Sequence, residues 1–290
     1  MFERLSRSWD LVKASAAVLR EDKELLLFPV MSSVATLLVM AAFLLPMIGL
    51  GALDGMGQGR VGIGAGSAGV WTTGKTLLAF LFYITQYFVI FYFNTALVGA
   101  AMKRLEGGNP TLGDGLAIAN SRLASILGYA LIAATVGMIL RALQERANFI
   151  GKIIVGLIGM GWTLATYMVV PVLAARNVGP IEAVKESALL LKKTWGENVI
   201  GQAGMTAAFV FIYMAAAVLA AVVLVAAIAS KSAVLIVPAG IAVIVGFLLI
   251  ALIQSALAGI YSAALYRYAT SGEGSAHFDK TALQAAFGQK

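Results

Sequence analysis

Six long segments without a charged residue divide the chain. They cover residues 25–53, 76–102, 123–140, 153–175, 198–230 and 232–266. Each reaches the roughly 18–20 residues that an α-helix needs to cross about 30 Å of hydrocarbon with its backbone N–H and C=O groups paired internally. None shows the short alternating pattern of a transmembrane β-strand. The pattern predicts an all-α, polytopic membrane protein with six transmembrane helices.

Two further helices are predicted outside these segments by apolar residues at alternating spacings of three and four. The first stripe consists of Phe2, Leu5, Trp9, Val12, Ala16 and Leu19, and the second of Ile181, Val184, Ala188, Leu191 and Trp195. Charged residues occupy the other faces, so each helix is amphipathic. Its apolar face must lie in the headgroup layer or pack under the bundle. Such a helix either caps the fold or contacts lipid or a partner, and both functions stay open.

The two amphipathic segments resemble each other in sequence. At an offset of 172, Val12, Lys13, Ser15, Ala16 and Leu19 align with Val184, Lys185, Ser187, Ala188 and Leu191. A third, weaker copy follows the helix-start signal Asn109-Pro110-Thr111. The chain is therefore predicted to repeat a unit of one cytoplasmic amphipathic helix and two spans three times. The units are residues 1–101, 105–175 and 176–269 of a single transmembrane domain, 1–269, followed by a cytoplasmic tail, 270–290, with a short helix at 277–287.

The distribution of basic residues predicts the orientation. The two termini and the loops between spans two and three and between spans four and five hold 15 Lys and Arg, and the opposite side holds 6. Short cytoplasmic loops retain basic residues, so both termini are expected in the cytoplasm. The first 24 residues are too charged for a signal peptide, and we expect no cleavage there.

Three stretches carry a family resemblance. They are SWDLVKASAAVLREDKELLLFP (8–29), the segment from Phe93 to Arg146 that begins FNTALVGAAMKRLEGGNP, and VGPIEAVKESALLLKKTWGENVIG (178–201). They resemble a family of uncharacterised bacterial integral membrane proteins, defined as a domain of unknown function. More distantly, the helix-span-span unit is similar to the membrane domain of some glycerophosphodiester phosphodiesterases. The resemblance implies a location in the bacterial inner membrane and supplies no site residue, and the chain has no catalytic phosphodiesterase domain.

Composition excludes several kinds of chemistry. Apolar residues make up 60% of the chain and charged residues 12%, which suits a membrane and not a soluble domain. Without cysteine there is no disulfide and no thiolate site, and His277 is the only histidine. The stretch 69–76 fits the P-loop pattern, but it follows a glycine-rich loop instead of a buried strand. No catalytic, metal or cofactor site is therefore predicted, and neither nucleotide nor nucleic acid is an expected partner.

Polar residues within the six spans are neutral. They include Gln86, Asn94, Thr166, Tyr167, Gln202 and Gln254. The absence of ionisable residues there disfavours a proton relay. Neutral side chains of this kind either form hydrogen bonds between helices or line a permeation path.

These patterns favour a non-enzymatic membrane scaffold or lipid-organising protein that forms homo-oligomers. Its expected partners are membrane lipids, in particular anionic headgroups on the cytoplasmic side. The alternative is a channel or carrier for a neutral or amphiphilic solute, and a membrane-embedded enzyme is a third possibility.

Overall fold

The computed structural model describes residues 2–49, 70–193, 195–272 and 278, and these residues form helices and short connections without a strand. The long helices are α2 (Leu27–Gly49), α3 (Val70–Leu105), α5 (Leu123–Arg146), α6 (Phe149–Ala165), α9 (Trp195–Ala229) and α10 (Ala233–Ser271). The shorter ones are α1 (Phe2–Glu21), η1 (Lys23–Leu26), α4 (Leu112–Asn120), α7 (Val169–Ala175) and α8 (Pro180–Lys193). Six helical segments within the described ranges are long and apolar enough to cross a membrane. The prediction of an all-α, multi-pass membrane protein is confirmed.

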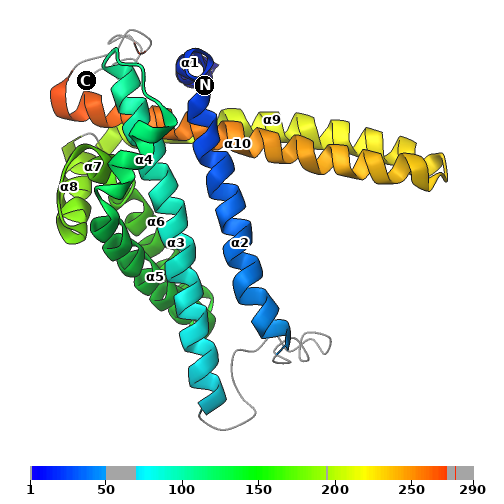
Figure 1. Ribbon diagram of the computed structural model, residues 1–290, viewed down its shortest axis with the longest axis horizontal. Helices are drawn as coiled ribbons and strands as arrows, with labels where there is room; N and C mark the ends of the chain where they lie inside the picture. The colour runs from blue at the N-terminus through cyan, green and yellow to red at the C-terminus, as the bar shows by residue number, and fades with distance from the viewer. Residues whose placement is uncertain (1, 50–69, 194, 273–277, 279–290) are drawn as a thin grey trace.

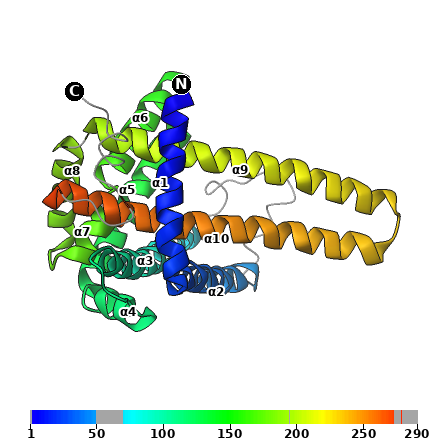
Figure 2. The ribbon, with the colours of Figure 1, turned by 90° about the horizontal axis from the view of Figure 1, so that it is seen from above.

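The long helices take two directions. Helices α2 and α3 run side by side, and the α5–α6 pair extends toward the same end of the molecule (Figure 1). The α9–α10 hairpin instead runs crosswise to α2 and α3 and projects from the body (Figures 1 and 2). Helix α1 lies across the hairpin near its base (Figure 2). We call the end of the molecule that carries α1, α4 and the C-terminal end of α3 the α1 face.

The core lies near the α1 face, where three helices meet. Helix α10 contacts both α3 and α7, and α3 contacts α7. Residues from all three are almost fully buried there, namely Ala96, Leu97, Ala100, Met168, Val172, Leu173, Ile260, Tyr261, Ala264 and Leu265. A Cβ added at Gly259 would lie 2.4 Å from Leu97 Cδ2. The glycine thus lets α10 cross close to α3, as small residues commonly do in membrane proteins.

Each of the helices α1, α4 and α8 packs on part of this framework. Helix α4 contacts α3, helix α8 contacts α6 and α7, and helix α1 contacts α9 and α10. The predicted helix start at Thr111 is confirmed, because Thr111 is the N-cap of α4. The exterior of the long helices is strongly apolar, with exposed side chains such as Leu38, Leu45, Phe149 and Leu157. Such a surface is stable against lipid and not against water.

The fourth span is interrupted. Helix α6 ends at Ala165 and α7 starts at Val169, so the break lies just before Pro171. Pro171 has no N–H to donate to the carbonyl of Tyr167, and its ring clashes with that carbonyl in a regular helix. The backbone hydrogen bond that Pro171 cannot form therefore accounts for a break in the helix about one turn before the proline. Pro46, in contrast, lies within α2, which extends to Gly49.

Candidate functional site

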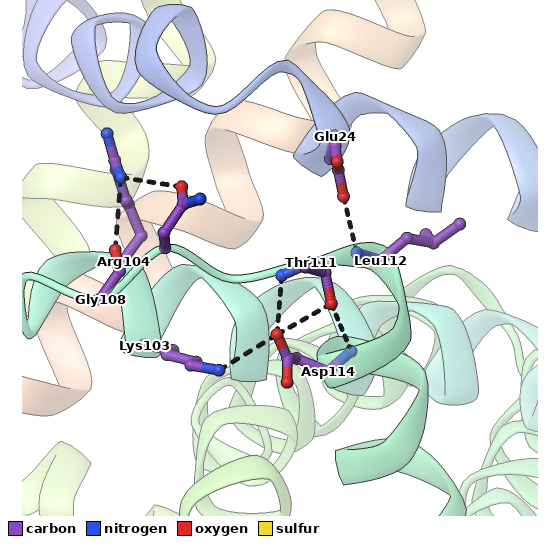
Figure 3. A network of polar contacts seen from close by, with 8 residues as sticks. Glu24, Lys103, Arg104, Gly108, Thr111, Leu112 and Asp114 are labelled. Atoms are coloured by element: carbon purple, nitrogen blue, oxygen red, sulfur yellow. Dashed lines mark hydrogen bonds and ion pairs between the residues drawn. The ribbon is translucent and has the colours of Figure 1, made fainter.

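A polar network on the α1 face joins the end of α3 to the start of α4 (Figure 3). The Thr111 N–H donates to Asp114 Oδ2 over 2.8 Å, and the Asp114 N–H donates to Thr111 Oγ1 over 3.2 Å, which forms a capping box. Lys103 Nζ on α3 lies 3.1 Å from Asp114 Oδ2. The Thr111 N–H, followed by Lys103 and the Thr111 hydroxyl, lowers the pKa of Asp114 to about 2. The α4 start is thus fixed by a carboxylate that stays ionised at neutral pH.

The same network includes the junction between α1 and α2. Arg104 Nη2 lies 2.8 Å from Glu21 Oε2. The Leu112 N–H donates to Glu24 Oε2 over 2.7 Å (Figure 3). Asp22, between these two carboxylates, is buried, and its Oδ2 has no hydrogen-bond partner. Burial raises the pKa of Asp22, and the nearby Arg104 guanidinium partly opposes this rise. The network couples three segments of the α1 face and exposes no reactive pair of groups.

Ser187 of α8 fills the break in the fourth span. Its hydroxyl donates to the Ala165 carbonyl over 2.6 Å and accepts from the Met168 N–H over 3.0 Å. The serine side chain is fully buried, so it pairs two backbone groups that would otherwise lack partners in an apolar environment. Nearby, Arg176 Nη1 at the end of α7 forms an ion pair with Glu186 Oε2 of α8. The carboxylate raises the pKa of the Arg176 guanidinium. Helix α8 is therefore bound to both ends of α7.

The predicted amphipathic stripes are divided between buried and exposed positions. Val12 and Leu191 are buried, Leu19 and Val184 are half-buried, and Trp9 and Ile181 are exposed. The side chains of Phe2, Leu5 and Trp195 lie outside the described residues. The centre of the protein-facing side is instead formed by Leu11, Ser15 and Val18 on α1 and by Ala183 and Ser187 on α8. On each helix, the face that packs against the protein is thus rotated about the helix axis relative to the apolar stripe. This face includes a buried serine.

The predicted intramembrane polar residues form different kinds of contact. Gln254 Oε1 on α10 accepts from the Tyr213 hydroxyl on α9 over 2.8 Å. The Thr166 hydroxyl donates to the Trp162 carbonyl in its own helix over 2.8 Å, and Tyr167 lies at the break beside it. Gln86 and Asn94 are half-buried on α3, and Gln86 Oε1 is buried without a partner. The Gln202 side chain lies outside the described residues.

Further hydrogen bonds between helices involve residues that the sequence did not single out. The Tyr92 hydroxyl on α3 donates to Asn120 Oδ1 at the end of α4 over 2.8 Å. Arg141 Nη1 on α5 donates to the Tyr83 hydroxyl on α3 over 2.9 Å. Ser187 is the most consequential residue of this kind. The alignment of Ser15 with Ser187 was a signal for it, since the shared position is polar and both copies are fully buried.

The structure describes most residues of the P-loop-like pattern, but it leaves out the glycine-rich stretch and most of the predicted tail helix. Residues 70–76 of the P-loop-like pattern lie within α3, where a helical backbone cannot wrap around a phosphate. The described part of the chain contains no group of three or more His, Cys, Asp or Glu side chains that could hold a metal ion. The glycine-rich stretch 50–69 lies outside the described residues, as does most of the predicted tail helix, including His277. Phe278, the one described residue of that tail helix, is buried against the core.

Comparison with known proteins identifies a family and no function. A family model described as a family of unknown function, DUF6159, matches residues 73–276, which is more than half of the chain. No curated protein and no solved structure matches the chain. The distant similarity to the phosphodiesterase membrane domain stays a prediction. By the extent of the match, this multi-pass membrane protein, with six candidate spans, belongs to the DUF6159 family of unknown function.

Proposed function

We propose that this protein is a non-catalytic scaffold of the bacterial cytoplasmic membrane that organises lipid and self-associates. The observation that carries the proposal is the pairing of neutral polar groups across helix interfaces. Tyr213 pairs with Gln254, and Tyr92 pairs with Asn120. A carrier or channel needs such groups free to face a solute, whereas here they are used to join helices. These paired polar groups thus act in assembly of the fold.

A threefold repeat underlies this scaffold. The second spans of the three predicted units are, in chain order, α3, α6–α7 and α10. Helix α4 packs on the second span of the unit before it, helix α8 does the same, and α1 packs on the α9–α10 pair of the last unit. Ion pairs reinforce two of these joints, Lys103 with Asp114 and Arg176 with Glu186. The cyclic order supports three related units around the shared core.

The α1 face is the surface for anionic lipid. Lys13, Arg20 and Lys23 are exposed on α1 and η1, and Lys185 is exposed on α8. We assign this face and both termini to the cytoplasmic side, in line with the excess of basic residues there. Each basic residue near an anionic membrane surface adds about 1 kcal/mol of attraction. Glu21, Glu24 and Asp10 on the same face reduce that attraction.

Self-association and lipid retention are tested together by measuring the mass of the purified protein. We expect a defined oligomer that keeps anionic lipid, and the triple variant Lys13→Gln/Arg20→Gln/Lys23→Gln is expected to keep several-fold less of it. The control is Arg146→Gln/Lys152→Gln, which removes two exposed basic residues beside the α5–α6 turn, at the other end of the molecule from the α1 face (Figure 1). A monomer whose lipid content is the same in wild type and triple variant contradicts the proposal.

One observation favours the alternative of a channel or carrier. Gln86 Oε1 on α3 is buried and has no hydrogen-bond partner among the described residues. An unpaired amide oxygen in an apolar environment costs about 1–3 kcal/mol, so a solute or water that paired with it would be bound. Thr95, nine residues further along α3, also has an unpaired buried hydroxyl. Nine residues correspond to about 900° of helix rotation, so the two groups lie on opposite faces and do not share one path.

A further inference from the structure

The α9–α10 hairpin crosses the body at a depth that can be measured along α3. The closest approach is at Gly259, whose added Cβ would lie 2.4 Å from Leu97 Cδ2. Lys103, which pairs with Asp114 on the α1 face, is six residues further along α3. At about 1.5 Å per residue, the crossing point lies about 9 Å below Lys103. Because a charged side chain marks the edge of the hydrocarbon, the hairpin lies beneath that edge.

This depth lies within one leaflet. The hydrocarbon core is about 30 Å thick, so each leaflet accounts for about 15 Å. A helix with its side chains has a radius of about 5 Å. A helix whose axis lies about 9 Å below the edge of the hydrocarbon therefore fits between the headgroups and the midplane. Since the hairpin runs crosswise to α2 and α3, it stays near this depth along its length (Figures 1 and 2).

The surface of the hairpin requires hydrocarbon on every exposed side. Between Glu197 and Arg267 the only charged residue is Lys231. Exposed side chains on both helices are large and apolar, among them Val218, Leu219, Ile241 and Ile244. A helix at the membrane surface needs a polar face, as α1 has with Asp10, Lys13 and Arg20. The hairpin has no such face, so it cannot lie at the water boundary.

We propose that the α9–α10 hairpin lies in the plane of the membrane, embedded among the acyl chains of the leaflet on the α1 side. Its long apolar segment on α9, from Ala208 to Ala229, is about 33 Å long at 1.5 Å per residue. Two helices of about 10 Å diameter then occupy about 660 Å² of that leaflet and none of the other. Lys231, at the tip, reaches the nearer headgroup layer through its flexible side chain.

This placement differs from the one that length and composition suggest. The same 33 Å also matches the thickness of the hydrocarbon, and a spanning hairpin would carry Lys231 to the opposite face. The in-plane hairpin inserts area into one leaflet only, which gives the protein a means to bend or thin the membrane around it. The placement rests on the direction and depth of the hairpin and does not depend on the proposed scaffold role.

The side on which the tip lies is tested by labelling, since the chain has no native cysteine. Ser232→Cys is compared in sealed vesicles with two controls, Glu106→Cys at the α1 face and Ala147→Cys at the α5–α6 turn, which lies at the other end (Figure 1). A membrane-impermeant maleimide is expected to reach Ser232→Cys only from the side that reaches Glu106→Cys. Labelling from the side that reaches Ala147→Cys overturns the placement and leaves the scaffold proposal intact.

If Ser232→Cys reacts with the maleimide from neither side, a depth profile along α9 distinguishes the in-plane from the spanning hairpin. Nitroxide labels are attached at Phe211→Cys, Val218→Cys and Val225→Cys, which are exposed and spaced by seven residues along α9. An in-plane hairpin gives three depths that agree within about 5 Å, one helix radius. A spanning hairpin places Val218 about 10 Å deeper than the other two, at seven residues of 1.5 Å each. That profile contradicts the proposal.

Discussion

Ser187→Ala is expected to lower the free energy of unfolding by about 2–6 kcal/mol, the largest effect among the single substitutions considered. The variant leaves the Ala165 carbonyl and the Met168 N–H without their partner. Each buried backbone group left unpaired costs about 1–3 kcal/mol. The loss is measured by denaturant unfolding in detergent, and hydrogen exchange of the Met168 amide is expected to accelerate with it.

Ser15→Ala is the matched control for this substitution. Ser15 aligns with Ser187 at the offset of 172 and is equally buried, but its hydroxyl has no hydrogen-bond partner. Helix α1 packs on α9 and α10, and both helices continue without a break. Removal of the Ser15 hydroxyl is therefore expected to leave stability within about 0.5 kcal/mol of wild type or to raise it. Equal losses in the two variants would show that the break does not depend on Ser187.

Gly115→Ala is expected to destabilise the protein by about 1–3 kcal/mol through steric overlap. A Cβ at this position would lie 2.7 Å from the Ala96 carbonyl oxygen and 2.4 Å from Phe28 Cζ. The first contact is with backbone, so α4 must move away from α3 to relieve it. The movement would also strain the joint that Thr111 and Lys103 form with Asp114. A lower thermal unfolding temperature in detergent is the expected readout.

Gly113→Ala, in the same helix, controls for helix propensity. Its added Cβ would meet only Thr111 Oγ1 at 3.6 Å, an ordinary contact. Replacement of glycine by alanine within a helix contributes up to about 1 kcal/mol of stability, and both variants share this gain. We expect Gly113→Ala to be as stable as wild type or more so. Similar stabilities for the two variants would contradict the close α3–α4 contact.

The existence of the six long helices and the start of α4 could be predicted from sequence. Both depend on local signals, the length of an uncharged apolar run and the Thr111 cap. The direction of the α9–α10 hairpin could not be predicted in this way. Its composition suits a spanning and an in-plane hairpin equally, and the crossing at Gly259 depends on residues that are far apart in the chain.

The candidate site was predicted less well because its key residues are polar within apolar surroundings. The apolar stripes were predicted to face either the headgroups or the bundle, and they divide, since Val12 is buried whereas Trp9 and Ile181 are exposed. Ser187 replaces a missing helical hydrogen bond, and that need arises only from Pro171 in a different helix. Periodicity in one segment carries no information about a broken backbone in another. Interhelical partners such as Tyr92 and Asn120 are likewise set by tertiary packing.

Solute flux through liposomes that contain the purified protein tests the scaffold account most directly. The account predicts no selective flux of neutral or amphiphilic solutes above that of protein-free liposomes, and no difference between wild type and Gln86→Leu. Gln86 is the residue to change, because its buried Oε1 is unpaired. Selective flux in wild type that is abolished in Gln86→Leu, while the variant stays folded, would contradict the scaffold and establish a transport path.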